Sequence, residues 1–430
     1  MPFSALGFSP AILPALQRAL TEKGYTAPTA IQQAAIPTAL QGRDVVGSAQ
    51  TGSGKTAAFA LPMLQLLMDA PLTKTRTVRG LVLVPTRELA AQVGGQILAL
   101  GKYMPQLPKV TVVFGGVSIN PQMMGLRTGA DIIVATPGRL IDLLEHKAVK
   151  IGDVQMLVLD EADRLLDLGF GEELKRILAL LPAKRQNLFF SATFPPAIEA
   201  LAASMLHEPL RIDVQATSET KLEITQRAME VDPGRRTQLL RHLIQTEKWS
   251  RVLVFVATKH AAEVVADKLR KASISAEPFH GELSQGKRTQ VLMDFKAKEV
   301  QVVVATDVAS RGIDIAQLPV VVNYDLPRSA DDYTHRIGRT ARAGEAGMAI
   351  NFVSATTEAH FRLIEKRHGI KVAREQVAGF EAVELAPVNT ADPQGTGGVK
   401  GMRPSKKDKL REAAAGVGAG ADETIDRPTK

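Results

Sequence analysis

Short runs of apolar, mostly β-branched residues alternate with longer stretches of helical spacing along most of this chain. The apolar runs are, in order, 44–47, 78–84, 110–114, 131–134, 154–159, 186–190, 251–256, 301–304, 320–323 and 348–352. Between them, stretches such as 57–68 and 172–181 repeat apolar residues at helical intervals. Nearly continuous apolar strands separated by helices are typical of parallel sheets that helices cover on both faces. The pattern therefore predicts an α/β fold.

The strand–helix series occurs twice, which predicts two domains. A break at 209–221, ending in the polar stretch 215–221, lies between the two series. From about Glu384 the chain is rich in Gly, Ala, Pro and Lys and has no apolar periodicity, so we expect this tail to be disordered. The predicted organisation is a first domain at 1–209, a linker at 210–221, a second domain at 222–373 and an extension at 374–430, disordered from about 384.

Polar residues stand one or two positions after the end of six of the apolar runs. They are Thr86, Thr136, Asp160, Ser191, Thr258 and Thr306. In open parallel sheets, ligands bind beyond the carboxyl ends of the strands. Threonine and serine also end strands without any function, which could explain one or two of these positions but hardly all six. We therefore expect the first four residues to lie on one rim of the first sheet and the last two to lie on one rim of the second sheet.

Composition narrows the class of protein. The chain has 430 residues, of which 45% are hydrophobic and 23% charged, as in soluble globular proteins. It has no cysteine, which excludes disulfides, cysteine-ligated zinc, iron–sulfur clusters and thiol nucleophiles. No apolar run reaches the ~20 residues of a membrane helix, and the first residues do not resemble a secretory signal. We therefore expect a cytoplasmic protein.

The charge balance favours a polyanionic partner. The chain carries 53 Lys and Arg against 45 Asp and Glu, for a net charge of +8. Aromatic residues make up only 4%, so we expect any nucleic acid to be held by its backbone rather than by base stacking. His280 and His335 have no cysteine or nearby histidine partners in the sequence, which argues against their binding a metal.

A glycine-rich loop follows the first apolar run. Residues 49–56 read AQTGSGKT and match the phosphate-binding loop, except that Ala49 replaces its first glycine. Gly52 and Gly54 allow backbone N–H groups to face phosphate oxygens, Lys55 is placed to reach the β- and γ-phosphates, and Thr56 offers a hydroxyl to Mg²⁺. The position of this loop between a strand and a helix supports a nucleotide site.

An acidic turn ends another predicted strand, where residues 158–163 read VLDEAD. A carboxylate in this turn can hold Mg²⁺ through water, and a second carboxylate can orient or deprotonate the attacking water. Taken alone, such a turn more often caps a helix. Together with the lysine loop, it makes nucleoside triphosphate hydrolysis the leading hypothesis.

These motifs resemble those of the DEAD-box RNA helicase family. Residues 160–163 spell DEAD, and the other motifs of the family follow its order over about residues 3–373. They are a Q motif with Phe8, Tyr25, Pro28 and Gln32; PTRELA at 85–90; GG at 115–116; TPGR at 136–139; SAT at 191–193; a Q-x-x-R element at 285–288; ATDVASRGID (motif V) at 305–314; and HRIGRTAR (motif VI) at 335–342. Tyr25 and Ala341 depart from the usual Phe and Gly. The sequences of these motifs are most similar to those of the bacterial RhlE-type subgroup.

The resemblance implies two tandem RecA-like domains that bind ATP and Mg²⁺. Its nucleotide-binding residues map to Phe8, Tyr25, Gln32, Ala49, Gln50, Thr51, Gly52, Ser53, Gly54, Lys55, Thr56, Gly312 and Asp314. The resemblance assigns catalysis to Lys55, Asp160, Glu161 and two arginine fingers, Arg339 and Arg342. It assigns the metal to Thr56 and Asp160, partly through water. Gln32 would read the adenine edge and so favour ATP.

The same resemblance implies an RNA partner and a coupling device. RNA contacts, mainly to the backbone, would come from Arg87, Gly115, Gly116, Thr136, Arg139, Gly281, Arg288 and Thr306. Coupling between nucleotide and RNA would run through Asp163, Ser191, Thr193 and His335. The implied activity is RNA-stimulated ATP hydrolysis that closes the two domains on single-stranded RNA and separates short duplexes without processive travel. Candidate partners are ribosome-assembly or RNA-decay proteins, and the chain is expected to be a monomer.

Two alternatives stay open at this point. The chain could be an ATP-gated RNA clamp or scaffold that does not separate strands. It could also be a DNA helicase, although the DEAD sequence and the Q motif argue against this alternative. The tail raises a separate question, because residues 400–411 carry six basic side chains against Asp408. This run is either a solubilising end or a tether that holds RNA nonspecifically.

Overall fold

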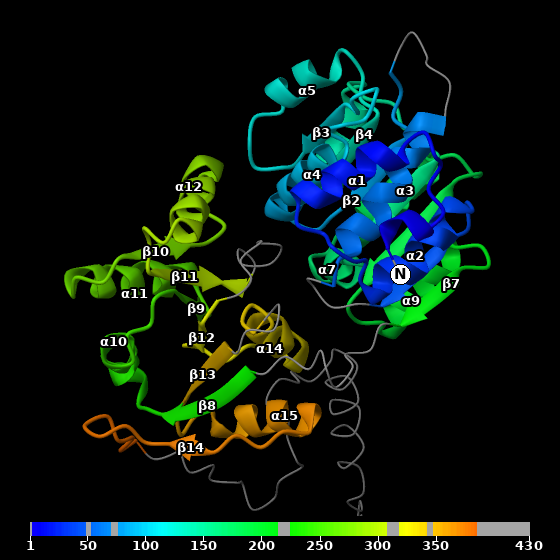
Figure 1. Ribbon diagram of the computed structural model, residues 1–430. Coiled ribbons are helices and arrows are strands. Elements are labelled where there is room, and N and C mark those ends of the chain that lie inside the picture. Colours follow the sequence, from blue (N-terminus) through cyan, green and yellow to red (C-terminus); the bar gives the residue numbers. More distant parts are fainter. Residues whose placement is uncertain are drawn as a thin grey trace, which may run out of the picture. The chain divides into compact units, whose positions relative to one another are not determined.

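The computed structural model describes residues 2–48, 53–69, 76–213, 224–307, 318–341 and 347–384 (Figure 1). They form two seven-stranded sheets, and each strand pair within them is parallel. This arrangement confirms the α/β fold with two parallel sheets that the apolar runs predict.

The first sheet is built from residues of the first half of the chain. Its strands, in spatial order, are β3 (Val110–Val113), β4 (Ile132–Ala135), β2 (Gly80–Leu83), β5 (Met156–Leu159), β6 (Gln186–Ser191), β1 (Val45–Ser48) and β7 (Leu210–Asp213). Phe189 and Phe190 are neighbours in β6 but belong to different hydrophobic cores. Successive side chains of a strand point to opposite faces, so a strand that is apolar throughout requires a helical layer on each side.

Two helical layers supply these cores. A short 3₁₀ turn (Phe3–Ala5) and four helices cover one face, namely α1 (Leu13–Glu22), α2 (Ala30–Leu40), α3 (Lys55–Asp69) and α4 (Arg87–Leu100). The other face packs against α5 (Asn120–Leu126), α6 (Pro137–Glu145), α7 (Ala162–Asp167), α8 (Gly171–Leu180) and α9 (Pro196–Met205).

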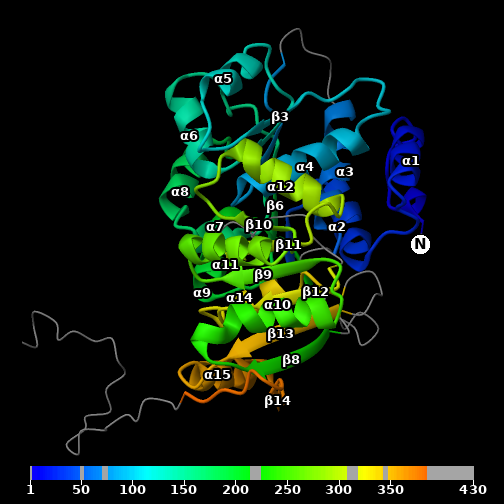
Figure 2. The same cartoon turned by 90° about the vertical axis from the view of Figure 1, so that its left-hand side faces the viewer.

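The second sheet repeats this plan. Its strands, in spatial order, are β10 (Ala276–Phe279), β11 (Val302–Thr306), β9 (Val252–Val256), β12 (Val320–Asn323), β13 (Gly347–Val353), β8 (Ile224–Glu230) and β14 (Arg374–Glu375). On one face lie α10 (Arg236–Thr246), preceded by a 3₁₀ turn (Pro233–Arg235), and α11 (Lys259–Lys271). The opposite face packs against α12 (Gln285–Lys296), α14 (Ala330–Ile337) and α15 (Glu358–His368), and Figure 2 shows these elements from the side.

Four strands are not predicted by the apolar runs. They are β7, β8, β10 and β14. Their sequences, LRID, ITQRAME, AEPF and RE, are short or interrupted by polar residues. Leu210–Asp213 corrects the predicted linker, because this segment pairs with β1 as strand β7. The remainder of the predicted linker, from residue 214 to 221, lies outside the described residues.

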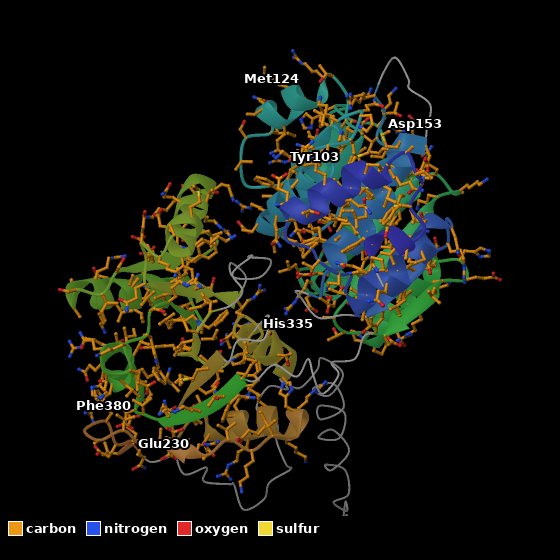
Figure 3. All side chains as sticks on the ribbon, in the orientation of Figure 1. Tyr103, Met124, Asp153, Glu230, His335 and Phe380 are labelled. Carbon is orange, nitrogen blue, oxygen red and sulfur yellow. The ribbon has the colours of Figure 1, made fainter. Side chains whose placement is uncertain are left out.

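The described chain continues past the predicted end of the second domain. β14 pairs with β8, and Val377 and Phe380 pack on the core that α10 covers (Figure 3). The carboxylate of Asp232 accepts hydrogen bonds from the N–H groups of Val383 and Glu384, each at 3.1 Å. The segment to Glu384 is therefore part of the second domain, whereas the basic run at 400–411 lies outside the described residues. No described helix combines the length and the apolar character that a membrane crossing requires.

Candidate nucleotide site and nucleic-acid interface

The candidate nucleotide site lies at the carboxyl ends of three neighbouring strands of the first sheet. Lys55 is the first residue of α3, after the loop that follows β1, and Asp160 directly follows β5. Ser191 is the last residue of β6, which lies between β1 and β5. The parallel order of the strands therefore brings these three predicted site residues to one rim.

Asp160 is the most strongly perturbed titratable group at this rim. Burial raises the pKa of its carboxyl group to about 6, and the nearby charge of Lys55 opposes that rise. The backbone N–H of Glu161 donates to Oδ1 of Asp160 at 3.0 Å. A buried carboxylate that resists ionisation is stabilised in its charged form by a cation beside it. Asp160 and the Thr56 hydroxyl offer the oxygen ligands that Mg²⁺ prefers, so the residues present fit this ion.

Glu161 stands at a sharp turn between a strand and a helix. Its backbone is left-handed, with φ 52° and ψ 53°, and α7 begins at the next residue. A non-glycine residue in this region is uncommon and strained, and such strain often occurs at functional sites. The turn places two carboxylates side by side at the end of β5.

Gln32 joins the Q motif to the phosphate-binding loop. Its Oε1 accepts from the N–H of Thr29 at 3.0 Å, and its Nε2 donates to the carbonyl oxygen of Gly54 at 3.0 Å. The Thr29 hydroxyl donates to the carbonyl oxygen of Ser53 at 2.7 Å. A Cβ atom on Gly54, whose φ is +94°, would lie 2.4 Å from Nε2 of Gln32. Glycine at position 54 is therefore required for this contact.

The aromatic residues of the predicted Q motif are part of the first core. Phe8 is buried there, and Tyr25 packs against the same cluster. Several predicted nucleotide residues cannot be placed: Ala49, Gln50, Thr51, Gly52, Gly312, Asp314 and the finger Arg342 lie outside the described residues.

Three of the four predicted coupling residues form one hydrogen-bond network in the first domain. Oδ2 of Asp163 accepts from both the N–H and the hydroxyl of Thr193, at 3.1 and 2.9 Å. The hydroxyl of Ser191 accepts from the N–H of Asp163 at 3.3 Å and donates to the carbonyl oxygen of Thr193 at 2.7 Å. The motif at 191–193 is thereby tied directly to the acidic turn.

His335, the fourth predicted coupling residue, has a different partner. It lies on α14, where Figure 3 labels it, and its Nδ1 contacts the guanidinium of Arg164. Arg164 also donates to Oδ1 of Asp332 at 3.2 Å. Arg164 was not predicted from the sequence, although it directly follows the DEAD residues at 160–163 and could have been found there.

The predicted RNA contacts of the first domain gather at strand ends and helix starts. Arg87 is the first residue of α4, and Thr86 before it caps this helix by accepting from the N–H of Leu89. In the second domain, Thr258 caps α11 in the same way. A Cβ atom on Gly116, whose φ is +74°, would lie 2.4 Å from the guanidinium of Arg87. The side chain of Arg87 therefore lies directly against this glycine, which follows Gly115.

Arg139 lies at another helix start on the same rim. Thr136 is the N-cap residue of α6, and Nη2 of Arg139 donates to the carbonyl oxygen of Val117 at 2.8 Å. Nη1 of Arg139 is buried and has no hydrogen-bond partner within the described residues. A buried unpaired donor of this kind is costly unless a ligand engages it.

In the second domain, Arg288 pairs with Glu88 of the first. Nη2 of Arg288 lies 2.9 Å from Oε1 of Glu88, both side chains are buried, and Nε2 of Gln285 donates to the same oxygen at 3.4 Å. The pairing of Glu88 with Arg288 was not predicted. A Cβ atom added to Gly281 would have no other atom within 4 Å apart from those of its chain neighbours, and Thr306 ends β11.

Motif VI contains a buried arginine that the sequence analysis did not assign. Nε and Nη2 of Arg336 donate to the two carboxylate oxygens of Asp307, at 2.6 and 2.7 Å. Arg339 is also buried, and its carbonyl oxygen accepts from the N–H of Leu318 at 3.2 Å. Motif VI thus has one arginine held within the second domain and a predicted finger three residues later.

The fold and the rim define a nucleotide-binding protein built from two parallel α/β sheets. Two family models match it, "DEAD/DEAH box helicase" at residues 29–201 and "Helicase conserved C-terminal domain" at 235–344. The chain belongs to the DEAD/DEAH box helicase family.

Named relatives agree with this assignment. The chain is 43% identical over 377 residues to "ATP-dependent RNA helicase DeaD" of Mycobacterium tuberculosis (strain H37Rv), covering 88% of this chain and 66% of that protein. It is 42% identical over 376 residues to "ATP-dependent rRNA helicase rrp3" of Emericella nidulans, covering 87% of this chain and 80% of that protein. The chain thus spans slightly less than two thirds of the length of the mycobacterial relative.

Solved structures of similar proteins contain nucleotide analogues and RNA. S. cerevisiae Dbp5 bound to RNA and ADP BeF3 matches with a TM-score of 0.76 and 30% identity, covering 87% of this chain and 95% of that chain. Mss116p bound to ssRNA and AMP-PNP matches with a TM-score of 0.76 and 29% identity, covering 84% of this chain and 77% of that chain. These likenesses extend over both sheets, so both domains share the tandem RecA-like fold.

Proposed function

We propose that this chain is an ATP-dependent RNA helicase that hydrolyses ATP when RNA is bound. The observation that carries the proposal is the rim where Lys55 and the buried Asp160 interact electrostatically, with Glu161 in a left-handed turn beside them. The names of the relatives and the RNA-bound structural neighbours support the same activity.

The nucleotide chemistry is distributed over both domains. Lys55 binds the phosphates and Gln32 reads the adenine edge, while Glu161 orients the attacking water and accepts its proton. Arg339 and Arg342 add positive charge at the γ-phosphate from the second domain. Thr56 and Asp160 hold Mg²⁺, which neutralises charge on the phosphate oxygens when it is bound.

RNA is bound through its backbone at the rims of both sheets. The proposed contacts come from Arg87, Gly115, Gly116, Thr136, Arg139, Gly281, Arg288 and Thr306. ATP and RNA each favour an arrangement that needs both domains, so each strengthens the binding of the other. The network of Asp163, Ser191 and Thr193 links RNA binding to the acidic turn. The result is local strand separation without processive travel.

The cellular setting is part of the same proposal. The name of the relative rrp3, an rRNA helicase, supports ribosomal RNA as a substrate. The candidate partners in this proposal are ribosome-assembly or RNA-decay proteins. We place the chain in the cytoplasm as a monomer, most similar to the RhlE-type subgroup.

Substitution Glu161→Gln tests the mechanism. The amide keeps the shape of the side chain but cannot accept the proton of the attacking water, so ATP hydrolysis should fall by ~10²–10⁴-fold. ATP-dependent RNA binding should persist or strengthen, as measured by titration of labelled single-stranded RNA with and without ATP. Hydrolysis within a few-fold of the parent would exclude Glu161 from the mechanism.

Two comparisons separate the alternatives. A pure RNA clamp would hydrolyse ATP without releasing a strand from a short RNA duplex, whereas a helicase releases it. A DNA helicase would show ATP hydrolysis stimulated by single-stranded DNA more than by RNA of the same length.

A further inference from the structure

A chain of buried hydrogen bonds crosses the second sheet on the face that α14 covers. Nη1 of Arg336, on α14, donates to Oδ1 of Asn323 at 3.0 Å. Nδ2 of Asn323 donates to Oδ1 of Asn351 at 2.8 Å, since the two residues face each other across β12 and β13. Nδ2 of Asn351 donates to the hydroxyl of Tyr333 at 3.2 Å, and this hydroxyl donates to Oε1 of Gln226 at 2.7 Å. The chain therefore links α14 to three strands of the sheet.

The direction of every hydrogen bond in this chain follows from its first member. A guanidinium only donates, so Asn323 must turn its oxygen toward Arg336 and its amide N–H₂ toward Asn351. Asn351 must then accept with its oxygen and donate to Tyr333. Reversal of either amide would place two donors or two acceptors face to face in the interior. A change at one member is therefore transmitted to the others.

Burial makes this order energetically important. The side chains of Asn323, Asn351 and Tyr333 are each 0% exposed. Polar groups at such depth are costly when they lose a partner, because water cannot replace it. Burial also raises the pKa of the Tyr333 hydroxyl to about 12, so this group stays protonated and able to donate at neutral pH.

The other end of the chain reaches motif V. Arg336 binds both carboxylate oxygens of Asp307, the residue that directly follows β11. Its guanidinium lies 4.9 Å from the ring centre of Phe255, on β9, the strand between β11 and β12. Arg336 thereby spans β9 and connects α14 to the carboxyl end of β11.

We infer that Asn323, Asn351 and Tyr333 are positioning residues for ATP hydrolysis, because they hold Arg336 in the orientation that fixes α14 against Asp307. This inference rests on the proposed function, in which Arg339, just after α14, reaches the γ-phosphate and Thr306, just before Asp307, contacts RNA. In this inference the three residues act only through Arg336.

The first test compares two substitutions that each remove one hydroxyl. Tyr333→Phe breaks the chain, whereas Tyr324→Phe removes a partly buried hydroxyl that bonds Thr237 at 3.0 Å, outside the chain. Tyr333→Phe should lower kcat of RNA-stimulated ATP hydrolysis by about 2- to 10-fold, the range for one lost neutral hydrogen bond, and leave KM for ATP within about 2-fold. Tyr324→Phe should leave kcat at the parent value, although both variants lower the thermal unfolding midpoint.

A double-variant cycle tests whether the residues act as one unit. Asn323→Leu interrupts the chain next to Arg336 and should lower kcat more than Tyr333→Phe does. The double variant should then lose little beyond Asn323→Leu alone, because Arg336 is already released. If the fold losses in kcat of the two single variants multiply in the double variant, the inference is overturned. If Asn323→Leu fails to fold, the Tyr333→Phe comparison decides alone, because it removes a single oxygen atom.

Amide hydrogen exchange gives a readout that does not depend on catalysis. Peptides containing Asp307 and α14 should exchange faster in Tyr333→Phe than in Tyr324→Phe. If the unsubstituted protein shows no RNA-stimulated ATP hydrolysis, the proposed function is contradicted. Amide hydrogen exchange would still test the chain of hydrogen bonds. Unchanged kcat together with unchanged exchange in Tyr333→Phe would overturn the inference, as would an equal loss of kcat in Tyr324→Phe.

Discussion

Gln32 donates a hydrogen bond from Nε2 to the carbonyl oxygen of Gly54 at 3.0 Å, although 22 residues separate them. The oxygen of the same amide accepts from the N–H of Thr29. These two partners decide which way the amide faces. Each end of an amide can form a second hydrogen bond, so one N–H and one lone pair are left for adenine N7 and N6–H. In the proposed function, adenine recognition and the phosphate-binding loop therefore share the side chain of Gln32.

Substitution Gln32→Glu should weaken ATP binding and reduce the preference for ATP over GTP. A carboxylate can accept from Thr29 but cannot donate to Gly54 or to adenine N7, so a loss of about 10-fold or more in ATP affinity is expected. Gln33→Glu is the matched control, because Nε2 of Gln33 donates to the carbonyl oxygen of Pro28 instead. Competition titrations with a fluorescent ATP analogue measure both variants. Equal affinities for Gln32→Glu and the control would contradict the assignment.

Asp160 should make the metal-free protein less stable as the pH rises. Its pKa in the folded chain is about 6 against an ordinary value of 3.8, so the folded state binds the proton more tightly than the unfolded state. The stability of the parent relative to Asp160→Asn should therefore fall between pH 3.8 and about 6 and stay lower above it. The full difference corresponds to ~3 kcal/mol.

Urea unfolding with EDTA, measured for both proteins from pH 4 to 8, checks this expectation. A difference in free energy of unfolding that does not vary with pH would show that burial does not perturb this carboxyl group.

Arg339→Ala should depress RNA-stimulated ATP hydrolysis far more than ATP binding by the first domain. Arginine fingers contribute on the order of 10³-fold or more to phosphate transfer, although two fingers that share the task need not each reach this value. Arg362→Ala is a suitable control, since Arg362 is an exposed residue on α15 of the same domain and forms a surface ion pair with Glu358. Steady-state kinetics with saturating RNA measure kcat. A loss no larger than that of the control would remove Arg339 from catalysis.

Removal of Leu385–Lys430 tests the proposed tether. The six basic residues of 400–411 should bind RNA phosphates, so the truncated chain should bind RNA more weakly and with a smaller salt dependence. The cut leaves Val383 and Glu384 in place, whose N–H groups bond Asp232. ATP hydrolysis at saturating RNA should not change, because no motif is lost. Identical affinities at several salt concentrations would identify the tail as a solubilising end.

Much of the fold could be predicted from the sequence because its signals are local. Val252–Val256 is apolar on both faces, and Val320–Asn323 is apolar up to its last residue, so each indicates a buried parallel strand without reference to the rest of the chain. The acidic turn after β5 is likewise a contiguous pattern. By contrast, β8 reads ITQRAME and is a strand because β13 and β14 lie on either side of it. Nothing in its own residues indicates these neighbours.

The partners of polar side chains were decided by the tertiary structure. The sequence alone determined that Arg336 lies in motif VI, but only the fold brings it to Asp307, 29 residues away, and to the asparagine pair across β12 and β13. Likewise, Arg288 meets Glu88 from the other half of the chain. The physical reason is that a hydrogen bond requires its two atoms within about 3 Å at a suitable angle. Such placement depends on how distant strands and helices pack, whereas hydrophobic periodicity depends only on neighbouring residues.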